Sequence, residues 1–148
     1  MILVSACLLG CNCRYDGKHN RISGIIDLKK TNEIISVCPE EIGGLATPRS
    51  PSEIKIINGR IQVITKDGND VTAEFIKGAQ ETLKIIEKNN IKFAILKSNS
   101  PSCGYGRIYD GSFSKKLIEG NGITAQIIKE SGLEVQICDE NNYVNYIK

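Results

Sequence analysis

The sequence predicts an α/β fold in which a mainly parallel, Rossmann-like sheet carries helices on both faces, with a small β-hairpin beside it. Short, continuous apolar runs typical of strands buried on both faces alternate with longer segments of helical periodicity. Twice a helical segment leads directly into an apolar run, as in the right-handed crossover units of parallel sheets. An Asn-Gly pair between two alternating segments indicates the hairpin.

The expected strands are short apolar runs, each of which ends at a turn signal. They cover residues 2–6, 34–37, 93–96 and 135–137. The hairpin covers residues 53–65, where Asn58 and Gly59 suit the two positive-φ positions of a type I′ turn.

Two amphipathic helices are expected between these strands. The first covers residues 70–88, with Asp70 or Thr72 as its cap. Its apolar residues recur at helical spacing: Val71, Phe75, Ala79, Leu83 and Ile86. The second covers residues 122–131 and stops at Gly132, which is placed as a helix-ending glycine.

The composition indicates the class of protein. The 148 residues suit a single domain, residues 1–148, that buries enough apolar surface to fold without disulfide or metal staples. The net charge is +2 and aromatic residues make up 5%, so a nucleic-acid polymer is not an expected partner. The long periodic segments do not fit a small disulfide scaffold, although the chain has six cysteines. We therefore expect a reducing, cytoplasmic location.

The N-terminal stretch "MILVSACLLGCNCRYDG" resembles a lipoprotein signal, because "LLGC" precedes Cys11. A secretory signal needs a charged segment followed by roughly 7 to 15 apolar residues, and no Lys or Arg precedes Cys11. No stretch approaches the roughly 20 apolar residues of a transmembrane helix. We therefore expect a soluble, uncleaved chain without a membrane partner.

Three cysteines follow expected strands. Cys7 comes directly after the first strand, Cys38 directly after the second, and Cys103 a few residues after the third. Because the carboxyl ends of parallel strands open onto one edge of the sheet, these thiols are expected to converge where α/β folds bind ligands.

The spacing of the cysteines bears on what they bind. A structural zinc site usually uses two close cysteine pairs, which this chain lacks. A 4Fe-4S cluster held by three cysteines would leave one iron free to accept a substrate atom as a Lewis acid. A zinc- or copper-binding sensor or buffer module without catalysis is the alternative.

Four motifs, in order along nearly the whole chain, resemble the family that contains the bacterial thiouracil desulfidases. They are "SACLLG..CRYDG", "CPE..GGL.TPR.P.E", "SPSCG...IYDGSFS" and "GNGITAQ". The resemblance implies an iron-sulfur enzyme that removes sulfur from a thiolated base or nucleoside without redox chemistry. Its substrate would be a small thiocarbonyl compound, and its products an oxygenated base and sulfide.

The resemblance also implies roles for particular residues. Cys7, Cys38 and Cys103 are the expected ligands of a 4Fe-4S cluster, and Cys13 is the reserve ligand. Glu40 of "CPE" and Ser100 of "SPSC" are the polar residues expected nearest the open iron. Our own mechanistic hypothesis makes Glu40 the general base for the attacking water and has Ser100 orient the water or the base. Cys11 and Cys138 do not match the family pattern. We expect Cys11 to be exposed and Cys138 to be a buried core thiol.

Overall fold

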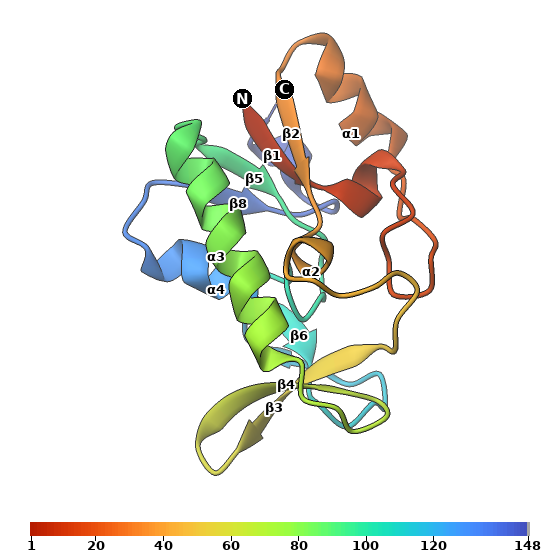
Figure 1. Cartoon of the computed structure of the whole chain (residues 1–148). Helices are drawn as coiled ribbons and strands as arrows, with labels where there is room; N and C mark the ends of the chain where they lie inside the picture. Colours follow the sequence, from red (N-terminus) through yellow and green to blue (C-terminus); the bar gives the residue numbers. More distant parts are fainter. Residues whose placement is uncertain (148) are drawn as a thin grey trace.

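A four-stranded parallel sheet lies at the centre of the structure, a computed structural model that describes residues 1–147 (Figure 1). The strands are β1 (Ile2–Ser5), β2 (Ile34–Val37), β5 (Phe93–Ile95) and β8 (Gln136–Cys138). Their order is β2-β1-β5-β8, and all three pairings are parallel. The predicted parallel sheet and its four strands are confirmed, with strand ends shifted by a residue.

Helices cover both faces of this sheet, as predicted. On one face, α3 (Thr72–Lys88) and α4 (Ile123–Glu130) pack against each other and cover a core that includes Leu3 and Ala94. The other face is covered by α1 (Ser23–Asp27) and by short 3-10 helices, which enclose Ile2 and Val4. Alternate residues of β1 thus enter different cores, which explains its continuous apolar sequence.

Three 3-10 helices connect the elements on this second face. They are η1 (Ala6–Leu9), η2 (Leu28–Lys30) and η3 (Tyr143–Asn145). Together with α1, they form the thinner of the two layers that cover the sheet (Figure 1). No helix of residues 1–147 is long and apolar enough to cross a membrane.

The ends of the two long helices follow the local sequence. Helix α3 begins at Thr72 with Val71 at the N-cap, so neither predicted cap residue, Asp70 nor Thr72, occupies that position. Asp70 Oδ1 still accepts a hydrogen bond from the Thr72 backbone N–H at 2.9 Å. Helix α4 ends at Glu130, and Gly132 follows with φ +79°. Both helices therefore end close to the predicted positions.

Two antiparallel hairpins project from the sheet. The first pairs β3 (Ser52–Ile57) with β4 (Arg60–Thr65), and the positive φ angles of Asn58 and Gly59 confirm the predicted turn. The second pairs β6 (Arg107–Tyr109) with β7 (Leu117–Glu119) and was not predicted. Its strands have three residues each and β7 is fully exposed, so they leave no apolar alternation to recognise.

The short helix α2 (Pro39–Ile42) packs directly on α3 through two glycines. A Cβ on Gly78 of α3 would overlap the carbonyl oxygen of Pro39, and a Cβ on Gly43 would overlap the carbonyl oxygen of Glu74. The absence of side chains at these positions allows the two backbones to approach closely. This contact fixes the segment that follows β2 against the longest helix.

Candidate functional site

A cavity of about 470 Å³ lies at the carboxyl ends of the parallel strands. The chain leaves β1 for β2 on one side and later returns to β5 on the other, so β1 and β5 flank the point where strand order reverses. Ligands of open α/β sheets bind at such a crevice. The ends of these two strands are tied together by a hydrogen bond from the Lys97 N–H to Ser5 Oγ at 2.9 Å.

Four of the six cysteines line this cavity: Cys7, Cys13, Cys38 and Cys103. Cys7 lies in η1 directly after β1, and Cys38 occupies the position before α2, directly after β2. Cys103 lies in the loop between β5 and β6. The convergence predicted for these three thiols is therefore found, and Cys13 joins them from the loop after η1.

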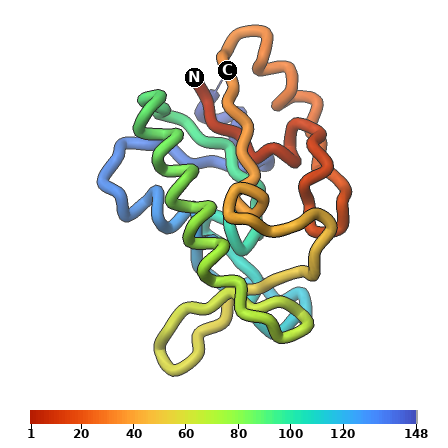
Figure 2. Tube along the Cα trace, viewed as in Figure 1, coloured from red at the N-terminus to blue at the C-terminus, as the bar shows by residue number. Residues whose placement is uncertain are grey.

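The loop that carries Cys13 lies beside the segment that follows α2 (Figure 2). The backbone N–H of Arg49 donates to the Tyr15 carbonyl at 2.8 Å, and Arg49 Nη2 donates to the Cys13 carbonyl at 2.9 Å. Cys38 Sγ lies 3.7 Å from the same Cys13 carbonyl oxygen. Cys13 therefore reaches the cavity through tertiary contacts with residues distant in sequence.

The thiols differ in their acidity. A hydrogen bond from Cys13 lowers the pKa of Cys7 to about 7, despite the opposing effect of burial. The same kind of bond lowers the pKa of Cys38, whereas hydrogen bonding to Cys38 and Cys7 raises the pKa of Cys13. Burial raises the pKa of Cys103 to about 12. Cys13 thus lies between Cys7 and Cys38 and favours their thiolate forms.

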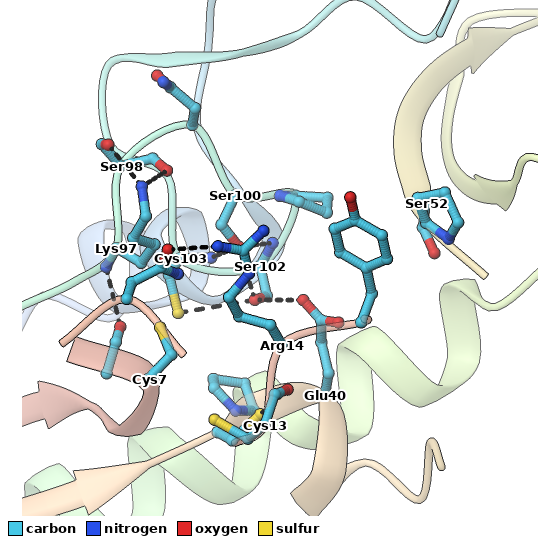
Figure 3. A pocket seen from close by; sticks show the side chains of 18 of the residues that line it. Cys7, Cys13, Arg14, Glu40, Ser52, Lys97, Ser98, Ser100, Ser102 and Cys103 are labelled. Atoms are coloured by element: carbon cyan, nitrogen blue, oxygen red, sulfur yellow. Dashed lines mark hydrogen bonds between the residues drawn. The ribbon is translucent and has the colours of Figure 1, made fainter. Parts of the chain in front are cut away.

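The thiols surround the cavity from several directions (Figure 3). Within residues 1–147, no group of three or more His, Cys, Asp and Glu side chains is arranged to hold a metal ion. Cys7 and Cys103 point into the same space in Figure 3, and Cys13 lies on another wall.

Glu40 lines the same cavity and is held by a buried ion pair. Its Oε2 lies 2.7 Å from Arg49 Nη2 and accepts a hydrogen bond from Arg49 Nε at 2.8 Å. The two side chains are only 15% and 10% exposed, respectively. Its other oxygen, Oε1, accepts a hydrogen bond from Ser102 Oγ at 3.1 Å (Figure 3). The carboxylate is thus fixed in one orientation.

The two serines of "SPSC" have different partners. Ser102 Oγ contacts Glu40 and lies 3.6 Å from Cys103 Sγ. Ser100 Oγ instead accepts hydrogen bonds from the backbone N–H groups of Ser102 at 3.1 Å and Cys103 at 3.0 Å. It also lies 3.1 Å from Ser102 Oγ. Ser100 therefore shapes the loop, and Ser102 is the serine in contact with the carboxylate.

Lys97 lines the wall beside Cys7 and is neutralised by Glu140. Lys97 Nζ lies 2.7 Å from Glu140 Oε1, and the backbone N–H of Ser98 donates to Glu140 Oε2 at 2.9 Å. Burial of Glu140 acts to raise its pKa, but the hydrogen bonds from Lys97 and Ser98 outweigh it and lower the pKa of this carboxyl.

The remaining cysteines lie away from the cavity. Cys11 is exposed, as predicted. Cys138 is 2% exposed in the core that also contains Val4, and burial raises its pKa to about 11. The prediction of a core thiol at Cys138 is confirmed.

The family model described as 2-thiouracil desulfurase matches residues 2–140. The chain belongs to this 2-thiouracil desulfurase family. A solved structure of the 4Fe-4S-dependent thiouracil desulfidase TudS is similar, with a TM-score of 0.87 and 41% identity, and the match covers 97% of this chain and 93% of that one. The Bacillus subtilis (strain 168) protein YbbK, described as uncharacterized, is 44% identical over an alignment of 151 residues that covers 96% of this chain and 98% of that protein.

For this desulfurase-family chain, sequence reasoning missed several residues of the cavity wall. Ser102, which contacts Glu40, stands in the same motif as Ser100, the serine predicted from the sequence. A second group comes from β3 and from the β6–β7 hairpin: Glu53, Tyr109, Phe113 and Lys115. Glu53, Tyr109 and Phe113 stand in the family motifs "PSE" and "IYDGSFS", and Lys115 directly follows the second motif. Their meeting across the cavity depends on tertiary contacts that no local pattern encodes.

Proposed function

We propose that this chain is a 4Fe-4S-dependent desulfidase that removes sulfur from the thiocarbonyl of a thiouracil-like base or nucleoside and releases sulfide. The observation that carries the proposal is the convergence of four thiols and Glu40 on one cavity. Membership of the family and the similarity to TudS support it. The reaction replaces a C=S bond by a C=O bond with water as the oxygen source, so it needs no electron donor or acceptor.

The donor set fits such a cluster. Thiolates are the usual ligands of iron-sulfur clusters, and the cavity walls carry four cysteines. We assign Cys7, Cys38 and Cys103 as the ligands because each follows a different strand, and we keep Cys13 as the reserve ligand. When bound, the cluster supplies a Lewis-acidic iron to the thiocarbonyl sulfur.

The residues around the cavity supply the proton chemistry. Glu40 accepts a proton from the attacking water, and Arg49 keeps its carboxylate aimed into the cavity. Ser102 donates to Glu40 Oε1, and Ser100 holds the loop that positions Ser102. We therefore propose that Ser100 acts on Glu40 indirectly, by positioning Ser102.

The proposal includes the setting of the enzyme. We propose that residues 1–148 act as a single desulfidase-like domain in a reducing cytoplasm, where cysteine ligands stay available for a cluster. All six cysteines being free supports this location. The partner is a small thiocarbonyl compound rather than a nucleic-acid polymer or a membrane.

Purification without oxygen tests the proposal. Brown protein that holds iron and acid-labile sulfide in about equal amounts, and that releases sulfide from 4-thiouracil, is expected. The Glu40→Ala variant should keep the cluster and lose sulfide release, whereas Glu41→Ala, on the exposed neighbour, should keep both. Colourless protein that holds zinc or copper would overturn the proposal in favour of a metal-binding module.

A further inference from the structure

Glu53 of β3 anchors the loop of the β6–β7 hairpin. Its Oε1 accepts hydrogen bonds from the backbone N–H of Gly111 at 3.0 Å and of Phe113 at 3.2 Å. The residue is 9% exposed, and it lines the same cavity as the cysteines. A second contact fixes this loop, because Lys55 Nζ lies 5.7 Å from the centre of the Phe113 ring. Glu53 thus couples β3 to residues 111–113.

The anchored loop forms one wall of the cavity. Phe113 and Lys115 belong to the lining, and both hold positive φ angles, +56° and +63°, which non-glycine residues rarely adopt. Such a conformation persists only where surrounding contacts impose it. The two hydrogen bonds to Glu53 supply part of that constraint.

The second oxygen of Glu53 is free to bind a ligand. Among residues 1–147, no group donates a hydrogen bond to Oε2, and no Lys or Arg forms an ion pair with this carboxylate. The oxygen is also not among the fully buried side-chain atoms that lack a partner, so part of its surface is accessible, and its residue lines the cavity. A carboxylate accepts strong hydrogen bonds from N–H and O–H donors.

Strand β3, which carries Glu53, begins at Ser52, and both residues line the cavity. Figure 3 shows Ser52 on the far side of Glu40 from Cys7 and Cys103. A substrate whose sulfur faces the cysteines therefore presents its opposite end toward β3 and the anchored loop.

We propose that Glu53 is a substrate-binding, specificity-determining residue whose Oε2 accepts a hydrogen bond from a donor across the substrate from its thiocarbonyl. This inference rests on the proposed function. The donor is the ring N–H of a free base such as 4-thiouracil, or a ribose hydroxyl of the corresponding nucleoside. In 2-thiouracil the atom across the ring from the sulfur is a C–H carbon, which offers no comparable donor.

The variant Glu53→Gln distinguishes the loop-anchoring role of Oε1 from the proposed substrate-binding role of Oε2. A glutamine can keep its carbonyl oxygen toward the N–H groups of Gly111 and Phe113 while it presents an amide donor to the cavity. The anchor is therefore retained, and the cavity-facing acceptor is lost. Glu119→Gln, on exposed β7, is the matched control.

Sulfide release by cluster-loaded protein is measured with 4-thiouracil, 4-thiouridine and 2-thiouracil. We expect Glu53→Gln to raise KM at least about tenfold for 4-thiouracil or 4-thiouridine, with little change in kcat and little change for 2-thiouracil. A selective effect on 4-thiouracil identifies the ring N–H, and one on 4-thiouridine identifies a ribose hydroxyl. Equal changes for all three substrates, or none, would overturn the inference.

Equilibrium binding keeps this test independent of turnover. Calorimetric titration of the same proteins with uracil and uridine should show Glu53→Gln weakening at least one Kd about tenfold, while the melting temperature stays near that of the wild type. This result supports the role of Glu53 even if no sulfide is released, in which case the proposed function alone fails. Unchanged affinity for both ligands, or a wild-type protein that binds neither, counts against Glu53.

Discussion

Arg49 Nε donates a hydrogen bond to Glu40 Oε2 at 2.8 Å, and Arg49 Nη2 forms an ion pair with the same oxygen at 2.7 Å. Nη2 also donates to the Cys13 carbonyl at 2.9 Å. One guanidinium therefore joins the expected general base to the loop that carries the fourth thiol. Arg49 follows α2 by several residues, and its planar fork suits this simultaneous contact. The geometry of Glu40 and that of Cys13 depend on one side chain.

Replacement of Arg49 should affect both folding and activity. Arg49→Met leaves Glu40 buried without its partner, which should lower the free energy of unfolding by about 3–5 kcal/mol. Sulfide release should fall as well, because the carboxylate loses its fixed orientation. Denaturant unfolding and kinetics measure the two effects. Lys84→Met, which breaks the exposed pair with Glu81, is the control and should change neither; equal effects of both variants would contradict the prediction.

Replacement of Ser102 and of Ser100 should have different effects on activity and stability. Ser102→Ala removes the hydroxyl that donates to Glu40, so kcat should fall by about tenfold with little loss of stability. Ser100→Ala removes the acceptor for two backbone N–H groups, so it should lower the melting temperature as well. Thermal denaturation and steady-state kinetics compare them. A larger loss of kcat in Ser100→Ala, at unchanged stability, would assign the direct contact to Ser100 instead.

Cys13 should be distinguishable from the three assigned ligands. We expect Cys7→Ser, Cys38→Ser and Cys103→Ser to lose most of their iron and acid-labile sulfide, and Cys13→Ser to retain them. Anaerobic reconstitution followed by iron and sulfide analysis measures this difference. Cys11→Ser serves as the control, because Cys11 is exposed and outside the cavity. Loss of the cluster in Cys13→Ser, with retention in one of the other three variants, would make Cys13 the ligand.

Gly78→Ala tests the contact between α2 and α3. Helix propensity alone predicts stabilisation by about 1 kcal/mol. Because the new Cβ would overlap the Pro39 carbonyl oxygen, we instead expect destabilisation by about 1–3 kcal/mol. Activity should also fall, since Pro39 lies between Cys38 and Glu40. Denaturant unfolding gives the sign; Gln80→Ala, on the exposed surface of α3, should be close to neutral. A stabilised Gly78→Ala protein would show that the two helices can separate without cost.

The Lys97–Glu140 pair should make stability depend on pH. Its hydrogen bonds hold the pKa of Glu140 below the ordinary value of 4.5, so the pair stabilises the fold above that pH. The stabilisation is lost as pH falls through the lower pKa of the folded state. Glu140→Gln should therefore cost about 2 kcal/mol at pH 7, and the difference from wild type should shrink below pH 4.5. Unfolding at pH 7, 5 and 3.5 checks this; a constant difference would point to packing rather than charge.

Local patterns were sufficient to predict the framework of the molecule. The apolar runs near Ile2, Ile34 and Phe93 form strands because strands covered on both faces must be continuously apolar. Right-handed connections and parallel pairing then bring the strand ends to one edge. These rules were enough to predict that Cys7, Cys38 and Cys103 meet.

Tertiary structure decided the details of the site. Whether Ser100 or Ser102 contacts Glu40 depends on how the loop after β5 is placed against α2. The hydrogen bond found joins Ser102 to Glu40, 62 positions apart in the sequence. The wall opposite the thiols depends on Glu53 bonding Gly111 and Phe113 across a hairpin with three-residue strands. The sequence by itself determined which strands deliver thiols, because burial imposes a periodicity that can be read locally. It did not determine which polar atoms meet, because those contacts arise only when separate segments pack together.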